Sequence, residues 1–258
     1  MKARVKKLAD GLVGVLADWN GVQAVTLQHF AEKDIYDPNF SVSFDVFCRE
    51  HIPEPEQRRN AFPDASYFEA SPAGTKDRFM AGDLPVRISY KECRRIEEAV
   101  DAASGNAGAL PGEQDTYLFY RLATGSELLS VEDWLAGIRS RLDQLPESFW
   151  TAWTNSSRDK LDHLLGDLGA AAIQDDALYF RLSLSGFLKA AAEFLFSVNH
   201  VFQPGPRDVT GVLSLLETLP DGFEANWQSL LRESEELPPQ RKRDVAEVLA
   251  RSLFALMG

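Results

Sequence analysis

The fold of the first half of this chain is decided by the stretch Ser41-Val42-Ser43-Phe44-Asp45-Val46-Phe47-Cys48. Val42, Phe44, Val46 and Cys48 alternate along it with Ser41, Ser43, Asp45 and Phe47. The side chains of a strand point alternately to its two faces. We therefore expect a strand with a uniformly apolar face and a more polar face, with Ser43 and Asp45 pointing the same way. Asp45 stands out, because it places a carboxylate on the more polar face.

The sequence around this strand predicts a mixture of helices and strands. Helical spacing of apolar residues predicts an amphipathic helix at 2–19, and a short run rich in β-branched residues predicts a strand at 22–27. Alternation predicts another strand at 84–90, and helical spacing returns over 91–103. Between them, the segment 67–82 is expected to hold one weak strand followed by a loop.

The second half is predicted to be helical. Small and turn-forming residues over 104–113 predict a linker, and no strand is expected beyond it. A helix is predicted from about 130 to 145, and the most apolar stretch, 177–202, is expected to be the central helix of a bundle. The expected organisation is a mixed domain at 1–103 followed by an all-helical domain at 114–258.

Composition excludes several classes of protein. The formal net charge of −12 argues against a nucleic-acid partner, which requires basic surface to displace counterions from phosphates. No apolar run is long enough to cross a membrane, and the N-terminal residues do not resemble a secretory signal. We therefore expect a cytoplasmic protein. Cys48 and Cys93 lie in apolar patterns and are predicted to be buried thiols.

Three short segments lie on or beside the predicted strands in a fixed order: Gln28-His29, Ser43-Phe44-Asp45 and Val86-Arg87-Ile88-Ser89. This order resembles the nucleotidyltransferase superfamily, in particular bacterial small-molecule nucleotidyltransferase-like proteins with a helical domain after the catalytic one. In that family the first segment is a Gly-Ser turn, the second is Asp-x-Asp, and the third carries another carboxylate. The resemblance implies an α+β fold, with a nucleotidyltransferase-like mixed sheet and helices followed by an all-α helical bundle.

A second likeness lies at the end of the apolar helix. The segment 195–207 is similar to the pattern of Asn, aromatic, Pro and Lys residues that closes the central helix in such proteins, with Arg207 at the Lys position. The resemblance implies that Asn199 and Arg207 could reach a phosphate of the nucleotide or substrate. The alternative is structural, with Asn199 as a helix-end cap and Arg207 as a cation complementing the helix dipole.

The activity implied by the resemblance is transfer of a nucleoside monophosphate from an NTP to a small-molecule acceptor, with Mg²⁺ as cofactor. Mg²⁺ requires hard oxygen ligands, and Asp-x-Asp supplies two carboxylates on one strand face. Here Asp45 remains as the catalytic residue and metal ligand, and Asp37 is a further candidate metal ligand. The implied nucleotide-binding or substrate-binding residues are Gln28, His29, Ser43, Arg87, Asn199 and Arg207.

Several alternatives follow from the missing carboxylates. The first is a nucleotidyltransferase-like protein with reduced or lost catalysis, and the second is a noncatalytic nucleotide-binding or protein-interaction module. A third is an active enzyme whose carboxylates come from Asp37, Asp83 or Glu69. Asp45 could instead face solvent or pair with Arg87, whose charge would then take the place of a metal. Oligomeric state, acceptor and base preference are left open.

Overall fold

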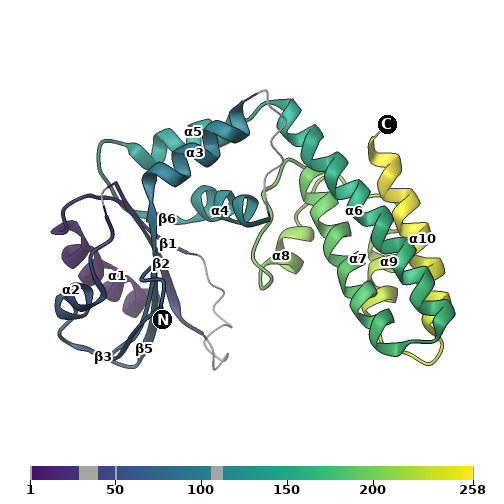
Figure 1. Ribbon diagram of the computed structural model, residues 1–258, viewed down its shortest axis with the longest axis horizontal. Coiled ribbons are helices and arrows are strands. Elements are labelled where there is room, and N and C mark those ends of the chain that lie inside the picture. Colours follow the sequence, from purple (N-terminus) through teal and green to yellow (C-terminus); the bar gives the residue numbers. More distant parts are fainter. Residues whose placement is uncertain (1, 29–39, 50, 106–112, 258) are drawn as a thin grey trace. The chain divides into compact units, whose positions relative to one another are not determined.

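The computed structural model describes residues 2–28, 40–49, 51–105 and 113–257 (Figure 1). The chain divides into two compact units, Met1–Ser104 with Arg121–Gln144, and Gly105–Tyr120 with Leu145–Gly258. It therefore leaves the first unit after Ser104 and returns to it at Arg121.

Within the described residues, the first unit contains a six-stranded sheet in the order β3-β4-β5-β2-β1-β6. The strands are β1 (Val22–Leu27), β2 (Val42–Cys48), β3 (Ala65–Ala70), β4 (Lys76–Ala81), β5 (Leu84–Glu92) and β6 (Ser126–Ser130). Strands β2 and β5 are parallel, and every other neighbouring pair is antiparallel. The predicted strand 41–48 therefore lies in the interior of a mixed sheet.

The apolar face of β2 forms the core of the first unit. Val42, Phe44 and Val46 are buried against α1 (Lys2–Ala17) and against Phe62, which directly follows α2 (Pro55–Ala61). Figure 1 shows α1 and α2 on the same side of the sheet. This arrangement confirms the period-two pattern, because alternate residues of one strand meet one helical layer.

The opposite face of β2 is also buried where the strand ends. Phe47 packs against Trp134 at the start of α5 (Trp134–Asp143), with 5.4 Å between the ring centroids. The side chain of Asp45 is 0% exposed on the same face. The expectation that Asp45 could face solvent is therefore wrong, because α5 and the last turn of α4 (Glu113–Thr124) belong to later sequence and supply Trp134 and Arg121 to this face.

Two strands correct the sequence prediction. Strand β4 occupies a segment that was expected to be a loop, since its charged residues mask an alternation in which Asp77 and Phe79 are buried. Strand β6 follows the linker, where no strand was expected. Its five residues, SELLS, show no clear alternation, and its conformation is set by antiparallel pairing with β1.

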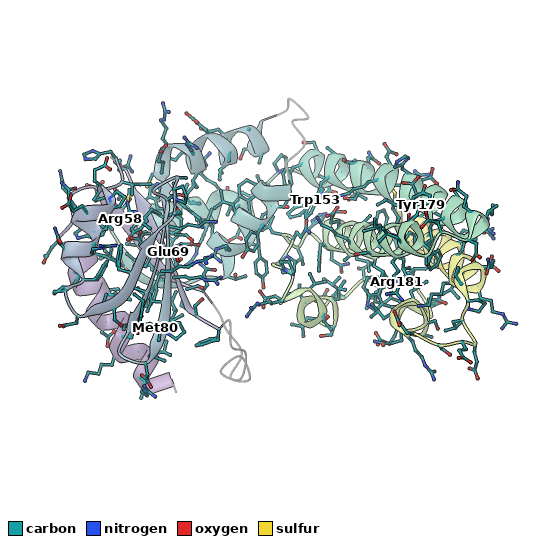
Figure 2. The ribbon with its side chains drawn as sticks, turned by 60° about the horizontal axis from the view of Figure 1, so that its bottom comes forward. Arg58, Glu69, Met80, Trp153, Tyr179 and Arg181 are labelled. Atoms are coloured by element: carbon teal, nitrogen blue, oxygen red, sulfur yellow. The ribbon has the colours of Figure 1, made fainter. Side chains whose placement is uncertain are left out.

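An ion pair lies inside the core between α2 and the sheet. Arg58, which is labelled in Figure 2, is 1% exposed. It donates to both carboxylate oxygens of Asp77 at 2.8 and 2.9 Å. The Tyr90 hydroxyl donates to the same carboxylate at 2.8 Å, and the carbonyl of Pro53 accepts from Arg58 at 2.5 Å. Burial and the neighbouring Asp77 carboxylate raise the pKa of Tyr90 above its ordinary value. The carboxylate and guanidinium satisfy each other where water is excluded.

The second unit is helical over its described residues. Its main helices are α6 (Glu147–Gln174), α7 (Ala177–Val198), α8 (Val209–Leu213), α9 (Phe223–Leu231) and α10 (Pro239–Phe254). Buried residues of α7 include Phe187, Phe194 and Phe196, as expected for a central helix. The helix ends at Val198 rather than at 202, because Asn199 caps it and His200 adopts a φ of 53°. The mixed sheet followed by helices confirms the α+β prediction.

Two further findings concern the second unit and the whole chain. Helix α8 is only five residues long, and the segment after it up to Pro220 forms no further helix. Among the helices of the described residues, none combines the length and the apolarity that a membrane span requires.

Candidate functional site

The candidate site centres on Asp45 in the middle of β2. Its register partners are Thr26 on β1 and Ser89 on β5, so it lies on an interior strand with a ladder on each side. Directly paired residues share a face of the sheet. Any group that meets the carboxylate must therefore come from this face or from the helices that cover it.

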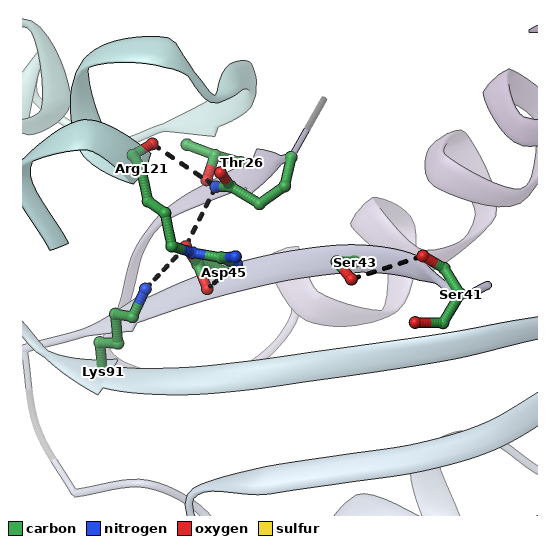
Figure 3. Close-up of polar contacts among 7 residues, drawn as sticks. Thr26, Ser41, Ser43, Asp45, Lys91 and Arg121 are labelled. Atoms are coloured by element: carbon green, nitrogen blue, oxygen red, sulfur yellow. Dashed lines mark hydrogen bonds and ion pairs between the residues drawn. The ribbon is translucent and has the colours of Figure 1, made fainter. Parts of the chain in front are cut away.

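Two cations hold the carboxylate (Figure 3). The Lys91 ammonium lies 2.7 Å from Asp45 Oδ2. The Arg121 guanidinium forms a bidentate pair, with Nε 2.8 Å from Oδ2 and Nη2 2.8 Å from Oδ1. Lys91 lies two residues beyond Ser89 on β5 and so points to the same face, while Arg121 comes from the last turn of α4. Paired charge-assisted hydrogen bonds of this kind are among the strong ones in proteins.

Gln28 completes the surroundings of the carboxylate. Its side-chain amide donates to Asp45 Oδ2 and to Thr26 Oγ1, at 3.0 Å in each case. Its backbone N–H donates to the carbonyl of Ser43 at 2.9 Å, which fixes the residue beside β2. The Gln28 side chain is buried, and it lies where the resemblance expects an open Gly-Ser turn.

The end of α4 is held close to the sheet by two residues. Arg139 of α5 donates to the carbonyl of Leu122 at 2.9 Å and also to the carbonyl of Gly125. A Cβ added to Gly125 would lie 2.8 Å from the Gln28 amide nitrogen and 2.9 Å from the carbonyl oxygen of Arg121. Glycine is therefore required here by close approach of the backbone.

The charges of the site favour an ionised Asp45. Burial by itself raises the pKa of Asp45, but Lys91 and Arg121 outweigh it and hold the pKa below its ordinary value. Burial lowers the pKa of Lys91, and the charge of Arg121 adds to this effect while Asp45 opposes it. With all three groups charged, two cations and one carboxylate leave a net charge of +1.

The donor set does not fit Mg²⁺. Both oxygens of Asp45 already accept from cations, whereas Mg²⁺ requires several free oxygen ligands in octahedral geometry. In the described part of the chain, no group of three or more His, Cys, Asp or Glu side chains could hold a metal ion. Asp83 pairs with Arg4, and Glu69 is the register partner of Arg78 on the outer strands.

The structure brings together some of the predicted site residues. Gln28, Ser43 and Asp45 lie together, and the Ser43 hydroxyl donates to the carbonyl of Ser41 at 3.4 Å (Figure 3). Arg87 is exposed and pairs in register with Ser43. The expected pairing of Asp45 with Arg87 is wrong, because Lys91 and Arg121 occupy both oxygens of the carboxylate.

The remaining predicted residues lie either outside the described residues or in the second unit. His29 and Asp37 lie outside the described residues. Asn199 belongs to the second unit, where its amide donates to the carbonyls of Leu195 and Thr218 at 2.8 and 2.9 Å. Its side-chain oxygen accepts from the Thr218 N–H at 2.8 Å, so Asn199 connects the end of α7 to a later loop. Arg207 is exposed in the same unit.

Lys91 and Arg121 are the functional residues that sequence reasoning missed. A signal for Lys91 was present, because it continues the period-two series of Arg87 and Ser89 on β5. Arg121 had no local signal, since 76 residues separate it from Asp45 and it comes from a helix after the linker.

No protein-family model and no curated protein matches this sequence. Among solved structures, the chain is similar to a nucleotidyltransferase-like protein from Exiguobacterium sibiricum 255-15. The match has a TM-score of 0.50 and 12% sequence identity, and it covers 95% of this chain and 72% of the other. The chain has a nucleotidyltransferase-like fold. At this identity the likeness concerns the fold, and the chemistry must be argued from the site.

Acid is expected to destabilise the protein through Asp45. Because the pKa of Asp45 is lowered on folding, its stabilising contribution is present above the ordinary value of 3.8 and is lost as the pH falls through the folded value. The free energy of unfolding of the wild type and of Asp45→Asn should be measured by urea titration between pH 7 and 2.5. We expect the difference between them to shrink below about pH 4. A difference that stays constant over this range would contradict the assignment.

Proposed function

We propose that this chain is a nucleotidyltransferase-like protein that binds the phosphate groups of a nucleotide without Mg²⁺ and has lost the transfer of a nucleoside monophosphate. The observation that carries the proposal is the double ion pair of Asp45 with Lys91 and Arg121. They pair with the carboxylate that would be a metal ligand in an active enzyme of this fold.

Electrostatics supports the loss of the metal. A divalent cation near Asp45 would meet two positive charges and would have to displace at least one of them from a buried carboxylate. Breaking a buried pair of this kind costs about 3–5 kcal/mol. Without a metal beside the phosphates, the charge that develops during phosphoryl transfer lacks its usual stabilisation.

The same cations support binding of an anion. Lys91 and Arg121 remain 22% and 17% exposed, whereas the carboxylate between them is fully buried. The site therefore presents its positive charge outward and keeps its negative charge inside. Ammonium and guanidinium groups are the side chains that most often bind phosphate in proteins.

Calorimetric titration with ATP tests this proposal. We expect ATP to bind in EDTA at least as tightly as in Mg²⁺, and Lys91→Gln to weaken binding about tenfold, as expected for one charged hydrogen bond. Lys6→Gln removes an exposed lysine from α1 and should leave the affinity unchanged. Binding that requires Mg²⁺, or Mg²⁺-dependent incorporation of labelled nucleotide into an acceptor, would contradict the proposal and favour the active enzyme.

A further inference from the structure

An apolar groove runs beside α1 on the helical side of the sheet. Its volume is about 570 Å³, and it is bounded by α1, by the residues that follow α2 and by the hairpin joining β4 to β5. The residues of α1 that line the groove recur at helical spacing and share one side of the helix: Arg4, Lys7, Leu8, Gly11, Leu12 and Val15. Asp45 lies on the opposite face of the sheet, so the groove is separate from the Asp45 site.

The floor of the groove is apolar. Leu12, Phe62 and Phe79 line it and are buried, and the rings of the two phenylalanines stack with their centroids 5.2 Å apart. Leu8 and Val15 are half-buried on the side of α1. Sites for small molecules in proteins have mostly apolar linings and volumes of about 300–1,000 Å³. The groove matches such sites in both respects.

The groove is elongated along α1. The helix rises by about 16 Å between Arg4 and Val15, at about 1.5 Å per residue. Gly11 lies near the middle of this stretch, and a Cβ added to it would meet nothing within 4 Å in the described part of the chain. A larger side chain at this position would therefore take up part of the groove. The shape suits a molecule that lies lengthwise beside the helix.

The charged side chains at the rim of the groove cancel one another. Arg4 and Lys7 stand on α1, whereas Asp64 and Asp83 stand on the opposite side, and all four are exposed. Arg4 forms an ion pair with Asp83, which connects α1 to the β4–β5 hairpin. A rim without net charge offers no surplus counterion to an ionic ligand, and burying an ion without one is unfavourable. The ligand that complements this groove is therefore uncharged.

We infer that the groove binds an uncharged, elongated apolar molecule, of which a long-chain primary alcohol is the simplest example. Its chain lies on the apolar floor beside α1, and its hydroxyl stays at the rim, where charged side chains can form hydrogen bonds with it. The inference goes beyond the proposed function and does not depend on it, because none of the residues that line the groove belongs to the Asp45 site.

Calorimetric titration of the wild type with hexanol, octanol and decanol tests this inference. We expect each added methylene to tighten binding by up to about fourfold, the factor for burying one such group. Binding should also show a negative change in heat capacity, which marks the burial of apolar surface. Decanoate has a chain of the same length but a negative charge, and it should bind more weakly than decanol.

Two glycine variants locate the binding site. Gly11→Leu places a side chain in the groove and should weaken decanol binding about tenfold. Gly14→Leu is the matched control, because it makes the same change on the same helix, also in open space, at a position that does not line the groove. Leucine forms helices better than glycine, so neither variant should lower the urea midpoint of unfolding.

Several outcomes would overturn the inference. These are a wild type that binds no alcohol, an affinity that does not rise with chain length, a Gly11→Leu variant that binds decanol like the wild type, and decanoate binding more tightly than decanol. The chain-length series uses the wild type, so it decides the matter even if Gly11→Leu is unstable. Lys91→Gln should leave decanol binding unchanged, and Gly11→Leu should leave ATP binding unchanged, so this inference and the proposed function can fail separately.

Discussion

Replacing Asp77 with Asn is expected to lower the free energy of unfolding by about 3–5 kcal/mol, because it leaves the buried Arg58 guanidinium without its counterion. Asparagine keeps the shape of the side chain, so the loss of stability measures the effect of removing the charge rather than a change in packing. The measurement is urea unfolding followed by tryptophan fluorescence, to which Trp19 contributes from the same core, where its ring stacks on Tyr90 with centroids 6.1 Å apart.

Two further variants test the cause of this destabilisation. Asp64→Asn removes an exposed carboxylate near α2 and should change stability by less than about 0.5 kcal/mol. The double variant Arg58→Leu, Asp77→Leu should recover much of the loss, since a buried ion pair can often be replaced by apolar residues. A single Asp77→Asn variant as stable as the wild type would show that Arg58 finds another partner.

Replacing Asp45 with Asn is expected to tighten the binding of inorganic phosphate about tenfold and to destabilise the protein by about 3 kcal/mol. Removing the carboxylate raises the net charge of the Asp45 site from +1 to +2, which attracts an anion more strongly. It also leaves Lys91 and Arg121 close together without a counterion. The affinity is measured by calorimetry in EDTA and the stability by urea unfolding.

The direction of this effect distinguishes two roles for Asp45. If Asp45 bound a metal that holds the nucleotide, Asp45→Asn would weaken nucleotide binding in Mg²⁺ and would leave phosphate binding in EDTA unchanged. Asp10→Asn, on the exposed side of α1, controls for the change in total charge. Lys91→Gln provides an independent readout, because it should weaken phosphate binding even if Asp45→Asn folds poorly.

Much of the first unit could be predicted from local sequence. Strand β1 begins and ends at the predicted residues, and β2 differs by one residue at its start. The alternation in β2 identified Val42, Phe44 and Val46 as one face, and all three meet the helical layer. These predictions are confirmed because the period of a strand is a property of the backbone and needs no distant partner.

The candidate site was predicted only in part. The strand pattern singled out Asp45 and the resemblance added Gln28, but Asp45 is buried on a face that was expected to be the more polar one. Lys91 was visible in the alternation of β5 without any indication that it pairs with Asp45. Arg121 was invisible, because contacts between residues far apart in the chain depend on how the elements pack rather than on a local period.

By itself, then, the sequence determined which residues of β2 face the core and where helices and strands alternate along the chain. The tertiary structure decided that the chain returns to the sheet at Arg121, adds β6 beside β1, and brings the Arg121 side chain to Asp45. The physical reason is that a buried carboxylate needs counterions, and the tertiary fold decides which residues of the chain supply them. Packing supplied Arg121 and Lys91 as the counterions of Asp45.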